Sequence, residues 1–309
     1  MSRKSQSSQY FHEYFAEWIE LYKQGAVRPV TYQKYVMTWR RLSELAPDLK
    51  ICELDKRKYQ LLINDYSRTH EKQTTLDFHN HLKSAIMDAF DEGLISTDPT
   101  RKVIIKGKTP ATKKPKFINQ FELQALLKNL TLSDAPNWDW FILLVAKTGL
   151  RFSEALALTP NDFDFDHHKI KITKTWNYKN AQGGFAETKN LSSKRTITID
   201  PILNMQILTL VAGLSADKPI FVNGRIYNSS VNIRLNELCN ETGVPVISVH
   251  SLRHTHASLL IFAGVSIASI AKRLGHSSVT TTQETYLHII RELENQDNDK
   301  IVQHLSQLV

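Results

Sequence analysis

The sequence predicts a mainly α-helical protein of two domains with one small antiparallel β-sheet. The chain has 309 residues, of which 41% are hydrophobic, and this length favours two cores over one. Apolar residues recur at spacings of three and four along most of the chain, as they do in amphipathic helices. Short β segments are expected in residues 163–178 and 194–200.

Four amphipathic helices are predicted in the first hundred residues. They occupy residues 8–24, 31–45, 56–68 and 74–94. Thr31 and Thr74 are expected to be N-caps, because a threonine hydroxyl can accept a hydrogen bond from a free helical N–H. Gly93 lies near the end of the fourth helix, where glycine tolerates a left-handed turn. A small helical domain of this kind suits a DNA clamp, and equally a helical interaction module.

Positive charge is concentrated in the same part of the chain. Residues 1–117 contain 21 Lys and Arg against 14 Asp and Glu, a net charge of +7, whereas the whole chain carries +8. Residues 100–117 hold seven basic residues, no acidic residue and two prolines. This composition predicts a linker that suits a phosphate backbone, although a solvated basic loop has the same composition. The candidate DNA-binding residues are Lys106, Lys108, Lys113, Lys114 and Lys116.

The rest of the chain is predicted to place six helices around the β segments. They occupy residues 119–131, 137–148, 201–213, 228–243, 251–263 and 267–274. The predicted organisation is a helical domain, a basic linker, a mixed α/β domain and a C-terminal segment, with bounds 1–99, 100–117, 118–290 and 291–309. In the C-terminal segment Ile301, Leu305 and Leu308 form one helical stripe, which we expect to dock on a neighbouring protomer.

Composition also narrows the cellular setting. The most apolar stretch, residues 140–150, is interrupted by Lys147, which favours a buried helix over a membrane span. The first fifteen residues lack the apolar core of a signal peptide. Cys52 and Cys239 are far apart in sequence and predict reduced thiols. A cytoplasmic protein without membrane partners is therefore expected.

The stretch AKTGLRFSEALALTPND, from residue 146, combines a helix stop with an arginine. Gly149 is expected to end a buried helix, and Ser153 or Glu154 to open the next turn. An arginine held at such a junction, Arg151, has a fixed direction, which bidentate phosphate recognition requires. The alternative is a structural ion pair between Arg151 and Glu154.

The stretch SVHSLRHTHASLLIFAG, from residue 248, places His250 and Arg253 on one face at the start of an apolar helix. This pair could hold an anion and supply a group that titrates near neutrality. A purely structural pair is the alternative. His250 and His254 also have the i, i+4 spacing of metal ligands, but no glutamate lies between them and the neighbouring cation opposes a second one, so no metal is predicted.

Three further positions carry candidate chemistry. Gly275 is expected to end a helix and leave His276 projecting from a tight turn, although an exposed cap residue has the same pattern. In ETKNLSSKRTITID two β segments are predicted to form a hairpin around a turn, beside which Lys189 or Lys194 could enter a DNA groove or simply be solvated. Tyr286, in TTTQETYLH, would alone be read as a core aromatic residue with one hydrogen bond.

Taken in order, TGLR, ETK, HSLRHTHAS, LGHSS and TTTQETYLH resemble the motifs of the tyrosine recombinase, or phage integrase, family. The motifs and their spacing are most similar to those of integrases from phages and conjugative transposons of Gram-positive bacteria. The resemblance is strongest over residues 118–290. The resemblance implies a C-shaped clamp of a helical core-DNA-binding domain and a mixed α/β catalytic domain. It also implies a site-specific recombinase that integrates or excises a mobile element.

The resemblance assigns a role to each motif residue. It implies catalytic roles for six residues: Arg151, Lys189, His250, Arg253, His276 and Tyr286. Tyr286 would be the nucleophile and Glu154 a supporting acidic residue. Lys194 stays open as an alternative to Lys189. Ten residues separate His276 from Tyr286 where many members have nine, and the arm-binding domain of many integrases is expected to be absent.

The chemistry of this set is coherent from the residues themselves. Arg151 and Arg253 can bracket the non-bridging oxygens of a phosphodiester, and His276 can add a third donor. A tyrosine hydroxyl must lose its proton as it attacks, and His250 is the best-placed base. Lys189 could protonate the departing 5′ oxygen. No carboxylate cluster for Mg²⁺ and no GxxxxGK[ST] motif occur in the sequence, so no cofactor is expected.

The expected partners follow from this chemistry and from the resemblance. They are double-stranded DNA at attachment sites, three further copies of the chain in a tetramer on a Holliday junction, and an accessory protein that directs excision. The expected location is the cytoplasm of a bacterial host, on the nucleoid. Two alternatives use similar residues: a monomeric type IB-like topoisomerase, and a DNA-binding regulator that has lost catalysis.

Overall fold

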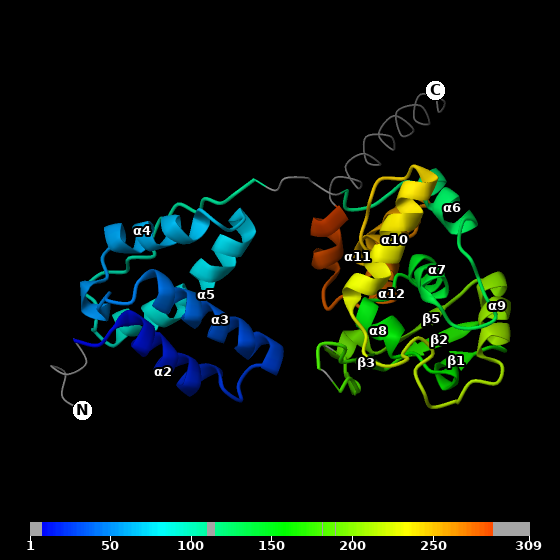
Figure 1. Ribbon diagram of the computed structural model, residues 1–309, viewed down its shortest axis with the longest axis horizontal. Coiled ribbons are helices and arrows are strands. Elements are labelled where there is room, and N and C mark those ends of the chain that lie inside the picture. Colours follow the sequence, from blue (N-terminus) through cyan, green and yellow to red (C-terminus); the bar gives the residue numbers. More distant parts are fainter. Residues whose placement is uncertain (1–7, 110–114, 181, 189, 287–309) are drawn as a thin grey trace, which may run out of the picture. The chain divides into compact units, whose positions relative to one another are not determined.

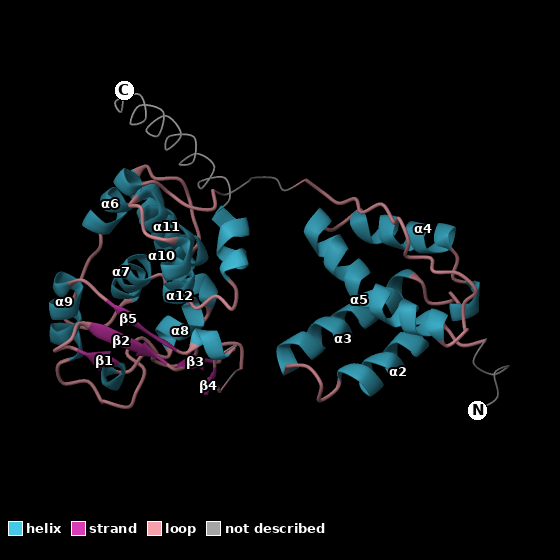
Figure 2. Cartoon of the chain, turned by 180° about the vertical axis from the view of Figure 1, so that it is seen from behind, coloured by secondary structure: helices cyan, strands magenta, loops and turns pink. Residues whose placement is uncertain are grey.

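A computed structural model describes residues 8–109, 115–180, 182–188 and 190–286 (Figure 1). The chain divides into two units, residues 1–113 and 114–309, each with its own core. The described residues are mostly helical with small antiparallel sheets, which confirms the predicted fold class (Figure 2). The exact segment bounds and the clamp arrangement stay predictions. None of the helices in the described ranges has both the length and the apolar character needed to cross a bilayer.

The first unit is built from four helices. They are α2 (Phe11–Lys23), α3 (Pro29–Leu45), α4 (Lys56–Ser67) and α5 (Lys72–Asp91), with a short 3-10 turn, η1 (Ile51–Glu53), before α4. Their apolar faces form one core, in which Phe11, Phe15 and Tyr59 are among the fully buried side chains. Burial of these amphipathic faces is what makes helices of this length stable.

The two N-caps predicted in this unit are wrong. Thr31 lies inside α3, which begins at Pro29 because proline has the backbone angle of a first helical residue and needs no N–H partner there. Thr74 lies inside α5, whose N-cap is Glu71, where a bridge to Lys108 fixes the chain before the helix. The prediction for Gly93 is confirmed, since it follows the end of α5 with φ +74°.

Part of the basic stretch lies against this first unit. The Lys108 N–H donates to the His70 carbonyl at 2.8 Å, and the Gln60 side chain makes two hydrogen bonds of 2.9 Å to the backbone of Ile104. Gly107 approaches the start of α5 so closely that an added Cβ would lie 2.2 Å from the Lys72 nitrogen. Residues 104–108 are therefore held by specific contacts.

The second unit places seven helices of the described residues around two small sheets. The helices are α6 (Gln120–Lys128), α7 (Trp138–Thr148), α8 (Phe152–Leu156), α9 (Pro201–Val211), α10 (Asn228–Thr242), α11 (Val249–Phe262) and α12 (Ile267–Leu274). An eighth helix begins at residue 279 and is described to Tyr286. α7 is buried along nearly its whole length and packs against α11, and these two helices position most of the site described below.

The strands form two separate sheets. One has the order β1 (Phe163–Asp164), β2 (Lys169–Ile172), β5 (Arg195–Thr198), and the other pairs β3 (Lys174–Trp176) with β4 (Phe185–Glu187). All pairs are antiparallel, and Ile170 faces Ile197 on the buried side. A 3-10 turn, η2 (Pro160–Asp162), precedes β1.

The expectation that the two strands around residues 190–193 form one hairpin with each other is wrong. β4 and β5 belong to different sheets, and the residues between them form a 3-10 turn, η3 (Leu191–Ser193). The Asn190 side chain accepts hydrogen bonds from the Ser193 N–H at 3.1 Å and from the Ser192 hydroxyl at 3.0 Å. This local bonding closes a single helical turn and carries the chain from one sheet to the other.

Candidate active site

Arg151 stands at the junction between α7 and α8. Gly149 caps the end of α7 with φ +69°, and an added Cβ there would lie 2.7 Å from the Cδ2 atom of His256, so only glycine fits. Arg151 is the N-cap of α8, and its N–H donates to the Glu154 carboxylate at 3.0 Å. The predicted alternative, an ion pair between Arg151 and Glu154, is present at 2.7 Å. It restrains the arginine at this junction.

Glu154 is the centre of a buried ion cluster. Its side chain is 1% exposed and accepts hydrogen bonds from Arg195 at 2.9 and 3.2 Å as well as from Arg151. Burial alone would raise the pKa of Glu154, but the hydrogen bonds and charges of the two arginines outweigh it and lower the pKa. Glu154 is therefore a carboxylate at neutral pH that fixes two guanidinium groups.

Arg253 lies on α11 and is 4% exposed. Its two terminal nitrogens donate to the carbonyls of Gly149 at 2.7 Å and of Leu274 at 2.6 Å. Arg151 reaches the same turn, donating to the Gly275 carbonyl at 3.0 Å and to that of Leu274 at 3.3 Å. The two arginines predicted from separate motifs thus converge on the end of α12.

The arginine cluster has more positive than negative charge, and burial destabilises the charged form of Arg253. Desolvation, and then the neighbouring Arg151, lower the pKa of Arg253 to about 9. Arg195 and Arg151 share the carboxylate of Glu154, whereas Arg253 is bonded to carbonyls. The cluster therefore carries an excess of positive charge, which is the condition for binding an anion such as a phosphate.

His276 follows the glycine that ends α12. Gly275 has φ +68°, and an added Cβ would lie 2.8 Å from an Arg195 nitrogen. The Nδ1 atom of His276 hydrogen-bonds the Thr282 hydroxyl at 2.7 Å. Burial first, and then the charge of Arg253 and the other arginines, lower the pKa of His276 to about 4. His276 is therefore neutral at physiological pH and beside the arginine cluster.

His250 occupies the first turn of α11, which Ser248 caps by accepting a hydrogen bond from the Ser251 N–H. His250 is exposed at the surface, and its pKa is lowered first by partial desolvation and then by the charges of Arg253 and Arg151. Its ring meets that of His254 edge-on, with 4.8 Å between the centroids. The predicted base is therefore next to the cation cluster, one helical turn from His254.

Tyr286 is buried, with 2% of its surface exposed. It packs in a small apolar cluster made by α11 and α12, whose other buried members are Ala257, Ile261, Ile270 and Leu274. Its hydroxyl hydrogen-bonds the Nδ1 atom of His254 at 3.0 Å. Burial raises the pKa of Tyr286 to about 12, against the opposing charge of Arg253. The ring packs as a core aromatic residue does, whereas the hydroxyl is close enough to Arg253 for the charge of that arginine to act on it.

The predicted lysines are less well placed in the structure. Lys189, Lys113 and Lys114 lie outside the described residues. Lys194 is exposed directly after η3. Lys106, Lys108 and Lys116 are exposed, and the charge of Lys116 acts on His254.

Sequence reasoning missed three contributors to the site. Arg195 binds Glu154 and the Arg273 carbonyl, and it lies in a β segment whose partner strands could not be foreseen. His254 bonds the tyrosine, although only a metal-ligand role was weighed for it. Arg273, in the last turn of α12, donates to His256 at 2.9 Å and so links α12 to α11. In the described ranges no three His, Cys, Asp or Glu side chains gather closely enough to hold a metal ion.

Comparison with protein families gives an assignment that agrees with this geometry. Residues 116–292, more than half of the chain, match the model of the phage integrase family. The chain belongs to the phage integrase family. It is a tyrosine recombinase, an enzyme of site-specific DNA recombination that cuts and rejoins DNA, as the motifs predicted.

Its relatives span most of its length. The chain is 25% identical to the integrase of Staphylococcus phage L54a, over 94% of this chain and 92% of that protein. It is 26% identical to the ICEBs1 integrase of Bacillus subtilis, over 87% and 76% respectively. Both relatives are integrases, and one of them belongs to a phage.

Solved structures share the fold of this integrase. The Tn1549 transposon integrase, in complex with a circular intermediate DNA, aligns with a TM-score of 0.77 at 17% identity and covers 94% of this chain and 99% of that one. A λ integrase tetramer bound to a Holliday junction aligns with a TM-score of 0.67 at 15% identity, over 90% and 80%. At these identities the likeness supports the fold.

Proposed function

We propose that this integrase cleaves DNA with the catalytic set Arg151, Lys189, His250, Arg253, His276 and Tyr286. One observation carries the proposal. Arg151 and Arg253, more than one hundred residues apart in sequence, donate to the same carbonyl at the end of α12, and His276 follows that carbonyl by two residues. Three groups that could bind one phosphate therefore surround a single turn.

In this proposal the arginines bind the two non-bridging oxygens of the scissile phosphate. A phosphate oxygen is a stronger acceptor than a carbonyl, so the guanidinium groups can exchange their bonds to the 274–275 carbonyls for bonds to DNA. His276, neutral because its pKa is about 4, donates a hydrogen bond through its other ring nitrogen. Removing one donor of this kind from an enzyme typically lowers the catalytic rate constant by a factor of about 100–1000.

The covalent step exchanges one phosphate ester for another. The Tyr286 oxygen forms a bond to phosphorus, its proton passes to a base, which we assign to His250, and the bond to the 5′ oxygen breaks. Lys189 supplies the proton for the departing 5′ oxygen. The product is a 3′-phosphotyrosine, which keeps the energy of the ester bond, so a second 5′ hydroxyl can attack it without ATP.

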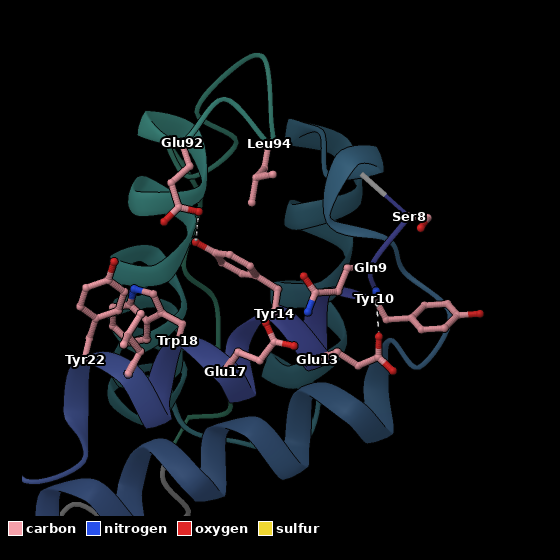
Figure 3. A pocket seen from close by; sticks show the side chains of 11 residues that line it. Ser8, Gln9, Tyr10, Glu13, Tyr14, Glu17, Trp18, Tyr22, Glu92 and Leu94 are labelled. Atoms are coloured by element: carbon pink, nitrogen blue, oxygen red, sulfur yellow. Dashed lines mark hydrogen bonds between the residues drawn. The ribbon is translucent and has the colours of Figure 1, made fainter. Parts of the chain in front are cut away.

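The grip on DNA is assigned to the first unit, in whose described residues two of the grooves differ in the sign of their charge. One, of about 510 Å³, is lined by α2 and the chain after α5 and presents Glu13, Glu17 and Glu92 among aromatic rings (Figure 3). The carboxylates of this groove would repel a phosphate backbone. We therefore assign it to the side of the unit that faces away from DNA.

The other groove lies between α3 and α5 and has a volume of about 430 Å³. It presents Lys34, Arg41 and two histidines, with one carboxylate, Asp77. Its wall includes Tyr66 stacked on Phe78, with ring centroids 4.0 Å apart, which makes that wall rigid. We propose that this groove and the basic residues 106–116 contact the phosphate backbone.

Assembly is the finer part of the proposal. Strand exchange through a Holliday junction requires four active sites, so we propose a homotetramer on two synapsed DNA sites, with an accessory protein directing excision. The λ integrase tetramer on a Holliday junction supports this arrangement. The C-terminal stripe of Ile301, Leu305 and Leu308, which lies outside the described residues, is the proposed contact between protomers.

One assay separates this proposal from the two alternatives. The purified chain is incubated with supercoiled plasmids that carry the DNA flanking its gene, in the presence of a magnesium chelator. A recombinase forms covalent protein–DNA adducts and joins two plasmids. A type IB-like topoisomerase relaxes single plasmids without joining them, and a regulator forms no adduct. Either of these two outcomes would contradict the proposal.

A further inference from the structure

His254 is the residue that holds the hydroxyl of Tyr286. It lies on α11 directly after Arg253, and its Nδ1 atom is 3.0 Å from the tyrosine oxygen. The two rings are tilted by 58° with 5.9 Å between their centroids. None of the proposed catalytic roles uses His254, and the base predicted from the sequence, His250, makes no hydrogen bond to Tyr286 among the described residues.

The direction of this hydrogen bond follows from the surroundings of the phenol. Tyr286 is buried among aliphatic side chains of α11 and α12, and in the described part of the chain His254 is the partner of its hydroxyl. If the Nδ1 atom of His254 donated, the tyrosine proton would be left without an acceptor in an apolar environment, which is costly. The tyrosine therefore donates, and His254 has its own proton on Nε2.

The charges around His254 keep its ring neutral. Burial, and then His250, Arg253 and Lys116, lower its pKa to about 4, and the ring in turn acts on His276. The neutral ring can accept a hydrogen bond, and its lowered pKa makes it a weak base. The proton of Tyr286, whose pKa is about 12, consequently stays on the phenol until a phosphate arrives. The contact orients the oxygen and leaves it protonated.

The position of the contact indicates that it prepares the nucleophile. Arg253 precedes His254 on the same helix, and its charge already acts on the phenol. A rigid helix therefore carries both a phosphate-binding group and the group that holds the attacking oxygen. A nucleophile restrained in this way loses little freedom when it reacts, which is where much of the advantage of an enzyme originates.

We infer that His254 is a positioning residue for the nucleophile, accepting the Tyr286 hydroxyl at Nδ1 and fixing its oxygen beside the arginine cluster before DNA is cleaved. This inference rests on the proposed role of Tyr286. It adds a seventh side chain to the proposed set and separates orientation of the phenol, by His254, from removal of its proton, by His250.

Two substitutions of His254 test the contact with Tyr286. One keeps an aromatic ring, and the other keeps a hydrogen-bond acceptor. His254→Phe keeps a flat ring and removes the acceptor. His254→Asn places an amide oxygen near the former Nδ1 atom and does not titrate. Single-turnover adduct formation is measured on the plasmid described above, across pH, with DNA binding and thermal unfolding as controls. His167→Phe, which alters a surface histidine paired with Asp164, is the matched control.

We expect His254→Phe to form the adduct about tenfold more slowly or worse, as the loss of one orienting hydrogen bond implies, with unchanged DNA affinity. His254→Asn should regain most of the rate and keep the pH profile of the unmodified enzyme, because the base is unchanged. Wild-type rates in His254→Phe, or equal losses in the two variants, would overturn the inference. Faster cleavage by His254→Phe would also overturn it, because the contact would then restrain the tyrosine.

A measurement without DNA keeps the inference testable if a variant folds poorly. Nitrogen NMR of the free protein should show His254 as the neutral ring with its proton on Nε2, and the Nδ1 signal should shift in Tyr286→Phe. A proton on Nδ1 would contradict the inference. If Tyr286→Phe still forms the adduct, the proposed function fails. If that variant is inactive while His254→Phe is fully active, only the role of His254 fails.

Discussion

The two units of this integrase handle positive charge in opposite ways. The first unit together with the basic residues up to position 117 carries a net charge of +7 and displays it on exposed side chains such as Lys34, Arg41 and Lys106. The rest of the chain carries a net charge of only +1, yet it buries Arg195 and Arg253 against the carbonyls of neighbouring turns. In the proposed function, the exposed charge of the first unit binds DNA and the buried charge of the second performs the chemistry.

The difference lies in what surrounds each cation. An exposed lysine is solvated, and its attraction to DNA is weakened by salt. A buried guanidinium has a fixed direction and a strong field, and after burial, the largest cause, arginine charge contributes to the lowered pKa values of His254, His256 and His276. Substitutions in the two regions should therefore differ in kind, and the predictions below run from the largest effect to the smallest.

The largest effect is expected from Glu154, the carboxylate that binds Arg151 and Arg195. Glu154→Ala leaves two guanidinium groups without their counter-ion, one of them only 5% exposed, and should lower the free energy of unfolding by about 3–5 kcal/mol. Glu122→Ala, which removes a partly exposed capping-box carboxylate, should cost about 1 kcal/mol or less. Denaturant unfolding of both variants measures this, and equal costs would contradict the account of the cluster.

Arg253→Ala should reduce adduct formation by about a hundredfold, equivalent to about 2.7 kcal/mol, while most DNA binding remains. The reason is that Arg253 is the most buried donor of the proposed phosphate site. The exposed Arg225, which lies over the ring of Tyr227, provides the control, and Arg225→Ala should cleave normally. An equal loss of DNA binding and of cleavage in Arg253→Ala would show that this arginine contributes to DNA affinity and not specifically to the chemical step.

Acid should destabilise the second unit through its buried histidines. His256 is hydrogen-bonded to Arg273, and burial with that charge lowers its pKa to about 3. Below pH 6.5 the His256 side chain binds a proton in the unfolded chain but stays neutral in the folded protein. The free energy of unfolding therefore decreases as the pH falls from about 6.5 towards 3. At pH 5 the loss due to His256 is about 2 kcal/mol. Unfolding curves of His256→Gln should show a weaker pH dependence over this range, and an identical dependence would refute the assignment.

The smallest effects are expected in the basic stretch. Changing Lys113, Lys114 and Lys116 to Ala should weaken binding to all DNA sequences by similar factors. The logarithmic slope of affinity against salt should fall by about 0.9 for each phosphate that the protein no longer neutralises. Single-turnover cleavage at saturating protein should remain close to normal. A sequence-dependent weakening, or an unchanged slope, would show that these lysines do not bind the backbone.

The sequence predicted most of the helices of the second unit. Helix positions followed from apolar spacing, and the turn glycines at 149 and 275 marked the two junctions that carry Arg151 and His276. Local signals failed where distant contacts decided the outcome. Thr31 and Thr74 are not caps, because an upstream proline begins one helix and a bridge with Lys108 precedes the other.

The remaining misses have the same physical origin. The hairpin expected around Asn190 failed because each of its strands found another partner in the sheets. Arg195 could not be recognised, since a basic residue in a short strand is usually solvated and its carboxylate partner lies forty-one positions away. His254 was visible next to Arg253, but its contact with Tyr286 depends on how two helices pack.

The most direct test of the account is covalent attachment by Tyr286. Tyr286→Phe keeps the buried ring, so it should fold, lose roughly 0.5–1.5 kcal/mol of stability and bind DNA normally. The account predicts that it forms no covalent adduct in the plasmid assay, that the exposed control Tyr227→Phe forms it at the normal rate, and that the wild-type adduct maps to the peptide around QETYLHIIR. Adduct formation by Tyr286→Phe, or attachment to any other peptide, would contradict the central claim.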